Sequence, residues 1–157
     1  MQLPTVTYEQ FLKFRPCWLE TEKGKKRLAR YGRLKPEWTA LDVLELNRVS
    51  PDDRLWAVLR EEFIPAPLLH EFACRCAEQA LRLVEQPDPR SIAAINAKRA
   101  WLRGEIDDEK LAAAWAAAQA AARDAAWDSA RAAAWAAARA AAQAEQIEIL
   151  KKMLMEE

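Results

Sequence analysis

The sequence predicts an all-α protein, a bundle of about six helices that ends in one long alanine-rich helix. From Ala112 to Ala144, 22 of 33 residues are alanine, the strongest helix former, and no glycine or proline follows Gly104. Between the alanines, larger side chains recur every four residues from Leu111 to Lys151. Upstream of this stretch, capping residues and prolines divide the chain into shorter segments with helical spacing of apolar residues.

Capping residues predict two short helices near the amino terminus. Thr7, with Gln10 three residues later, resembles a capping box, so a helix is expected over residues 7–14. A second helix is expected over residues 20–31. We expect Gly32 to end it, because glycine readily adopts the left-handed conformation that follows many helices.

Three more helices are expected in the middle of the chain. Thr39 can cap a short helix that reaches Leu46. Ser50, followed by a proline and two aspartates, predicts a helix that reaches Phe63. Pro67 then opens a helix to residue 84, which we expect to be the central core helix because its apolar residues keep helical spacing: Leu68, Leu69, Phe72, Ala73, Cys76, Ala80, Leu83 and Val84.

The last two helices follow from Asp88 and from the alanine-rich stretch. Asp88 is expected to cap a helix that runs to Arg103 and stops at Gly104. The final helix is expected over residues 108–154, about 70 Å long at ~1.5 Å per residue, which exceeds the size of a compact domain. If it bends, Asp128–Ser129 is the expected place. The sequence thus predicts a helical domain at residues 1–106 and the long helix at 107–157.

A four-residue repeat does not keep its large side chains on one face of the helix. Residues four apart differ by about 40° around the axis, so the repeat spirals and cannot form a uniform coiled-coil seam. Its alanines suit close packing against another helix. Its alternating tryptophans and arginines suit a partner-binding surface. The residues of this surface that we expect to contact a partner are Trp127, Arg131, Trp135 and Arg139.

A second candidate contact surface is the basic segment before residue 36. Seven of its 13 residues are cationic: Lys23, Lys25, Lys26, Arg27, Arg30, Arg33 and Lys35. This run is either a solvated helix face or a site for phosphates or acidic proteins, with Tyr31 and Trp38 available to stack on bases. Lys25, Lys26 and Arg30 are its predicted contact residues.

Composition and motifs argue against catalysis, metal binding and membrane insertion. The 24 cationic residues balance the 24 acidic ones, and there is no glycine-rich phosphate loop. His70 is the only histidine; with Cys74 and Cys17 it could supply zinc ligands, but buried structural thiols are the favoured interpretation. No signal-like or membrane-spanning apolar run occurs, so a cytoplasmic protein is expected. Because no catalytic constellation is found, we expect no enzyme activity, cofactor or metal.

Several segments resemble one family along nearly the whole chain. They are TYEQFLKFRPCWLE, WTALDVLEL, the block from Asp53 to Ile106, and the alanine–tryptophan–arginine repeat. Together they resemble the immunity-five-like family of immunity proteins, which occur in bacteria and their phages. The block from Asp53 to Ile106 is the specific part. The resemblance implies binding and neutralisation of a toxin protein, and it supplies no catalytic residues.

The expected function is therefore non-enzymatic binding that neutralises a partner macromolecule. The partner would be a protein, either a toxin or, for a phage-encoded inhibitor, a bacterial defence effector such as a CRISPR nuclease. Two alternatives remain open. One is a nucleic-acid-binding protein that uses the basic helix at residues 23–35. The other is a structural helical oligomer joined through the alanine faces.

Overall fold

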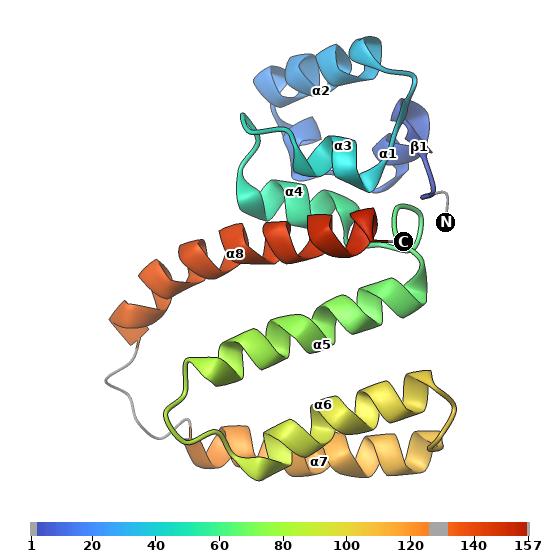
Figure 1. The fold of residues 1–157 in the computed structure, drawn as a ribbon. Helices are drawn as coiled ribbons and strands as arrows, with labels where there is room; N and C mark the ends of the chain where they lie inside the picture. Colours follow the sequence, from blue (N-terminus) through green and yellow to red (C-terminus); the bar gives the residue numbers. More distant parts are fainter. Residues whose placement is uncertain (1–2, 126–131, 157) are drawn as a thin grey trace. The chain divides into compact units, whose positions relative to one another are not determined.

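The computed structural model describes residues 3–125 and 132–156, and the side chains of residues 3–122 and 142–156. Within these ranges the protein has eight α-helices, one 3-10 helix and one small two-stranded sheet (Figure 1). The predicted all-α class is confirmed. Internal contacts divide the chain into two compact units, Met1–Pro65 with Leu154–Glu157, and Ala66–Met153.

The first unit holds the short helices. Its two strands pair antiparallel, with Val6 opposite Trp38 and Thr7 opposite Glu37. In chain order its elements are β1 (Val6–Thr7), α1 (Tyr8–Lys13), the 3-10 helix η1 (Cys17–Glu20), α2 (Glu22–Leu34), β2 (Glu37–Trp38), α3 (Ala40–Leu44) and α4 (Pro51–Val58). Residues of the C-terminal end of α8, described below, also belong to it.

The predicted caps begin these helices. Thr7 and Gln10 form a capping box at α1, in which the Thr7 hydroxyl accepts from the Gln10 N–H and the Gln10 side chain accepts from the Thr7 N–H. Thr39 caps α3 in the same way. The Ser50 hydroxyl accepts from a backbone N–H of the first turn of α4 at 3.1 Å. The helix starts were therefore predicted correctly, although α4 ends at Val58, five residues before the predicted end.

Gly32 does not end α2, so that prediction was wrong. The helix continues to Leu34. Gly32 shares one face of α2 with Gly24 and with the buried side chain of Leu28, at intervals of four residues. A Cβ atom on Gly32 would lie 2.6 Å from Cγ of Tyr8. The glycine therefore allows α1 to approach α2 closely.

An aromatic cluster packs in the first unit, although Trp56 leaves 41% of its surface exposed. The rings of Phe11 and Trp18 stack with centroids 6.1 Å apart, and Trp56 meets both rings edge-on. The Arg60 guanidinium lies 4.2 Å from the Phe14 ring centroid and 4.6 Å from that of Trp56. These contacts join α1, η1, α4 and the residues after α4.

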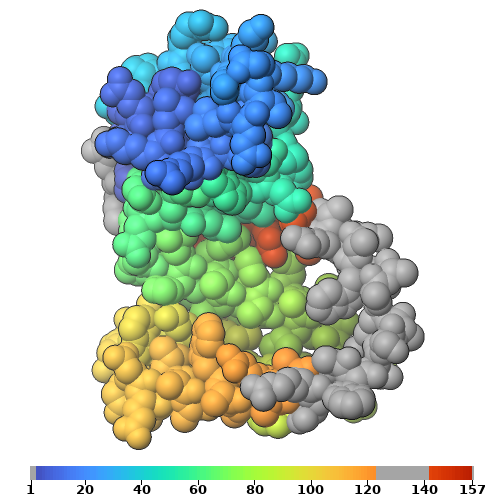
Figure 2. Space-filling model, turned by 180° about the vertical axis from the view of Figure 1, so that it is seen from behind, coloured from blue at the N-terminus to red at the C-terminus, as the bar shows by residue number. Residues whose placement is uncertain are grey.

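The second unit consists of four longer helices, α5 (Ala66–Arg82), α6 (Pro89–Leu102), α7 (Asp108–Ala125) and α8 (Ala132–Met155, in this unit up to Met153). Helix α6 packs against both α5 and α7. The surfaces of α6 and α7, yellow and orange, are continuous in Figure 2. As predicted, Asp88 caps α6, and Gly104 follows it with φ of +72°.

Alanines form the packed face of α7. Of the five side chains that are not exposed in its described part, Leu111, Ala114, Ala118 and Ala121 are spaced three, four and three residues apart, and the fifth is Ala120. This spacing keeps the first four on one face of the helix, as close helix packing requires. Trp115 lies on the outer side, and 55% of its surface is exposed. In this part of the repeat, the packed positions are mostly alanines, and the tryptophan faces solvent.

The region of the predicted long helix contains α7 and α8. The predicted bend at Asp128–Ser129 lies outside the described residues. The division of the chain at residue 106 stays a prediction. Among the helices that the structure describes, none is long and apolar enough to cross a membrane.

Candidate partner-binding surfaces

The tryptophan–arginine surface predicted for the repeat stays a prediction. Trp127 and Arg131 lie outside the described residues. Trp135 and Arg139 lie in α8, where the structure describes the backbone and not these side chains. The candidate surfaces that can be built from described side chains lie elsewhere in the chain.

The junction of α5 and α6 exposes apolar side chains. Leu83 is 78% exposed, Val84 44% and Ile92 43%. Leu83 and Val84 were expected in the core; that prediction was wrong, because α5 ends at Arg82 and both residues belong to the turn after it. Beside them lies an open hollow of about 390 Å³, lined by Glu78, Leu81, Arg82, Val84, Pro87, Ile92, Ile95 and Asn96.

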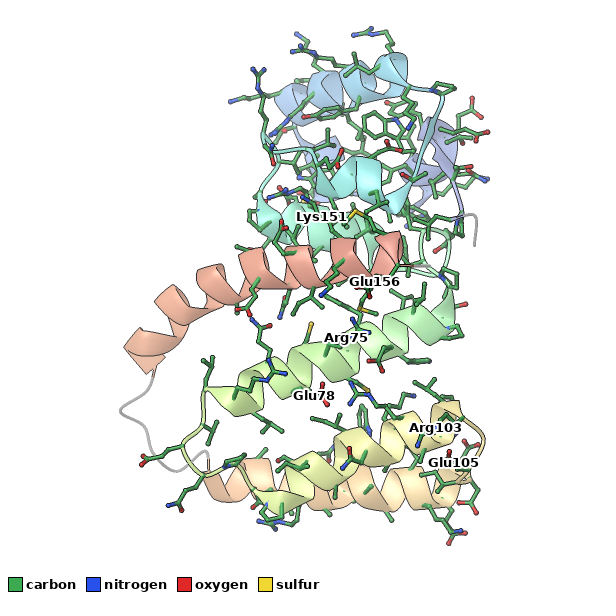
Figure 3. All side chains as sticks on the ribbon, viewed as in Figure 1. Arg75, Glu78, Arg103, Glu105, Lys151 and Glu156 are labelled. Atoms are coloured by element: carbon green, nitrogen blue, oxygen red, sulfur yellow. The ribbon has the colours of Figure 1, made fainter. Side chains whose placement is uncertain are left out.

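An ion-pair network holds α5 and α6 together next to this hollow. Glu71, Arg75 and Glu78 lie at intervals of four and three residues on one face of α5. Arg99 of α6 donates to both carboxylates: its Nε lies 3.0 Å from Glu71 Oε2 and one of its terminal nitrogens lies 3.0 Å from Glu78 Oε2. Figure 3 shows Glu78 projecting from α5 toward α6.

The network shifts the pKa of each carboxylate that Arg99 contacts. Hydrogen bonds from Arg99 hold the pKa values of Glu71 and Glu78 below their usual range, because these bonds favour the charged form. The same bonds raise the pKa of Arg99. The three side chains therefore stay charged at neutral pH and act as a clamp between the two helices.

The histidine and the cysteines of α5 occupy packed positions. The His70 ring meets the Trp101 ring edge-on, with centroids 5.8 Å apart. Burial raises the pKa of Cys74, and it raises the pKa of Cys76 to about 11. Both thiols are protonated at pH 7 and are weak nucleophiles. Over residues 3–125 and 132–156, no cluster of three or more His, Cys, Asp or Glu side chains could hold a metal ion.

Helix α2 gathers most of the predicted basic segment on one face. At about 100° per residue, its exposed cations span roughly 120° of the helix. They are Lys23, Lys26, Arg27, Arg30 and Arg33. Lys25 lies outside this arc, and its Nζ is 2.7 Å from a carboxylate oxygen of Glu22. Of the three predicted contact residues, the structure brings together Lys26 and Arg30. We call the five-residue arc the basic face.

A cavity in the first unit was missed by sequence reasoning. It has a volume of about 240 Å³ and is lined by side chains of α1, η1, α2, β2 and neighbouring segments. Tyr31 and Trp38, which we expected to stack on bases, meet each other edge-on in its wall, with ring centroids 6.0 Å apart. The only sequence signal was the abundance of aromatic residues before residue 40, which does not by itself predict a cavity.

Comparison with family models gives a match within the second unit. A family model described as Imm-5 like putative immunity protein matches residues 66–147. The matched segment contains the Arg99 network, the hollow and Trp115, whereas the basic face and the aromatic cavity lie before it. No curated protein and no solved structure matches the chain.

Proposed function

The chain belongs to the family of Imm-5 like putative immunity proteins, and from this we propose that it neutralises a toxic partner protein by binding it, without catalysis. The observation that carries the proposal is the exposure of apolar side chains within the matched segment. Leu83, Ile92 and Trp115 each leave more than two fifths of their surface exposed. Val84 and Ile92 line one hollow, and apolar side chains exposed together in this way are typical of protein–protein interfaces.

The hollow at the α5–α6 junction suits a side chain of the partner. Val84, Pro87 and Ile92 contribute apolar side chains to its lining, and Glu78 and Arg82 contribute charged ones. Buried apolar anchors surrounded by polar groups are the usual arrangement at the centre of a stable interface. The Arg99 clamp would keep the two helices of the hollow in place when the partner binds.

The target that we propose is a protein toxin that acts in the same cytoplasm. The family description supports this choice, and the free cysteines Cys17, Cys74 and Cys76 suit a reducing compartment. A bacterial defence effector, such as a CRISPR nuclease bound by a phage-encoded inhibitor, is the alternative target. Restoration of phage growth in a defended host, without rescue from a toxin, would favour that alternative.

A growth-rescue assay tests the neutralisation. The gene adjacent to this one in its source genome is induced in a bacterial host, with and without this protein. We expect the wild type to restore growth, and L83D or W115D to lose at least ten-fold of the surviving colonies, because a charge would be buried at the interface.

The matched control for this assay is L34D. Leu34 is 65% exposed but lies on α2, outside the matched segment, so L34D should rescue as well as the wild type. Circular dichroism would establish that all variants remain helical. Full rescue by both L83D and W115D would contradict the proposal that Leu83 and Trp115 contact the partner. If the product of the adjacent gene is toxic and the wild-type protein does not restore growth, the proposed neutralisation is contradicted.

A second candidate function, nucleic-acid binding, is favoured by the basic face. In the part of the chain that the structure describes, Lys26, Arg30 and Arg33 have no carboxylate within ion-pair distance. If about four phosphates are contacted, duplex affinity should fall about 100-fold between 50 and 200 mM salt. K26Q/R30Q should reduce this salt dependence and K25Q should not. Equal effects of both variants, measured by fluorescence anisotropy, would remove this function.

A further inference from the structure

We propose that the cavity of the first unit is a binding site for a small aromatic acid, a flat ring system that carries one carboxylate or similar anion. The cavity lies outside the segment that the family model matches, and the proposal is independent of toxin neutralisation. Its volume of about 240 Å³ is close to the lower end of small-ligand sites, and would hold a molecule of one or two rings.

The walls of the cavity suit a flat aromatic body. Phe11 and Trp18 stack on each other in one part of the wall, while Tyr31 and Trp38 form another. These rings are half-buried, so each leaves surface that a ligand ring can cover. Stacked and edge-on contacts with such rings favour aromatic ligands beyond the area that they bury.

Two cations give the cavity its preference for an anion. Lys23 and Arg27 of α2 lie in the lining, together with one carboxylate, that of Asp53, so the charged side chains sum to one positive charge. A guanidinium nitrogen of Arg27 donates to the backbone carbonyl of Arg48, which fixes the direction of the side chain. A charge held in place beside apolar walls binds an opposite charge more strongly than a freely moving one does.

Two pairs of cations on α2 allow the anion site to be tested. Lys26 and Arg30 belong to the basic face but do not line the cavity, whereas Lys23 and Arg27 belong to both. Replacing either pair by glutamine removes two positive charges from α2. A ligand in the cavity should respond to the first pair alone, and a ligand held by the general field of the basic face should respond to both.

The probe is 2-naphthoate, a two-ring carboxylate, and its uncharged counterpart is 2-naphthamide. Binding is followed by isothermal titration calorimetry and by quenching of tryptophan fluorescence, because Trp18 and Trp38 lie in the lining. We expect submillimolar binding of 2-naphthoate and at least ten-fold weaker binding of the amide. K23Q/R27Q should abolish this preference, and K26Q/R30Q should keep it.

Two more variants keep the test decisive if K23Q/R27Q does not fold. K23Q alone should lower the preference for the acid. V49F, which places a larger side chain in the lining, should weaken binding of both compounds at least ten-fold without loss of helicity. Equal affinity for acid and amide, equal loss in both double variants, or no binding of 2-naphthoate at millimolar concentration would each overturn the proposal.

Discussion

Replacing Arg99 by methionine should lower the free energy of unfolding by about 3 kcal/mol at pH 7. The substitution removes four hydrogen bonds between α6 and the carboxylates of Glu71 and Glu78, while both carboxylates stay charged. Loss of this partner is costly because Glu78 loses its hydrogen-bonded guanidinium and Glu71 keeps only the pair with Arg75, whose Nε lies 3.1 Å from its Oε1. The Arg99 side chain is only 26% exposed, so water compensates little.

The cost of R99M should depend on pH in a defined direction. In the wild type, Arg99 depresses the pKa values of Glu71 and Glu78 below those of the unfolded chain. The corresponding stability is present above the unfolded pKa, about 4.3, and is lost as pH falls through the folded values. The difference between wild type and R99M should therefore be largest near pH 7 and should narrow below about pH 4.

The control for this prediction is R103M. Arg103, directly after α6, also forms an ion pair, with its Nε 2.6 Å from a carboxylate oxygen of Glu105. Both side chains are more than half exposed, so this pair should contribute little to stability. Urea unfolding followed by circular dichroism at pH 7 and pH 4 should give a large, pH-dependent effect for R99M and a small one for R103M. Equal effects of the two variants would show that the Arg99 network stabilises the fold no more than the exposed Arg103–Glu105 pair does.

The capping residues explain why the fold was predictable from sequence. Thr7, Thr39, Ser50 and Asp88 act on backbone groups within three residues, so their effect is readable without knowledge of the rest of the chain. The pairing of β1 with β2 was not predictable, because two-residue strands carry no periodic pattern. The role of Gly32 was predicted wrongly for a different reason: it depends on a contact with Tyr8, which is distant in sequence.

The candidate sites were only partly predictable, because surface exposure depends on where an element ends. The sequence identified the basic segment, but only the phase of α2 separates Lys25 from Lys26 and Arg30. Leu83 and Val84 continue the apolar spacing of α5 and were therefore read as core. They are exposed because the helix ends at Arg82, two residues before its predicted end. The cavity depends on tertiary contacts between residues of β1, α1, η1, α2, β2, α3 and α4, which no local sequence pattern reports.

Replacing Gly24 by alanine should lower the free energy of unfolding by about 2 kcal/mol. Alanine alone would favour the helix by about 1 kcal/mol. At this position, however, a Cβ atom would overlap the carbonyl oxygen of Trp18 and lie 2.8 Å from its carbonyl carbon. Those are backbone atoms of η1, so α2 or η1 must shift, and the loss of packing outweighs the gain in helix propensity.

The neighbouring Gly32 provides the matched comparison, because its Cβ would meet a side chain instead of backbone. G32A should destabilise the wild type through contact with the Tyr8 ring. It should destabilise a Y8A background less, because there only the Cβ of residue 8, 3.1 Å from the added methyl group, remains in contact and the gain in helix propensity offsets more of the cost. G24A should destabilise both backgrounds equally. Thermal unfolding of the six proteins measures these differences. A G24A variant as stable as its parent would mean that α2 and η1 are not in close contact at Gly24.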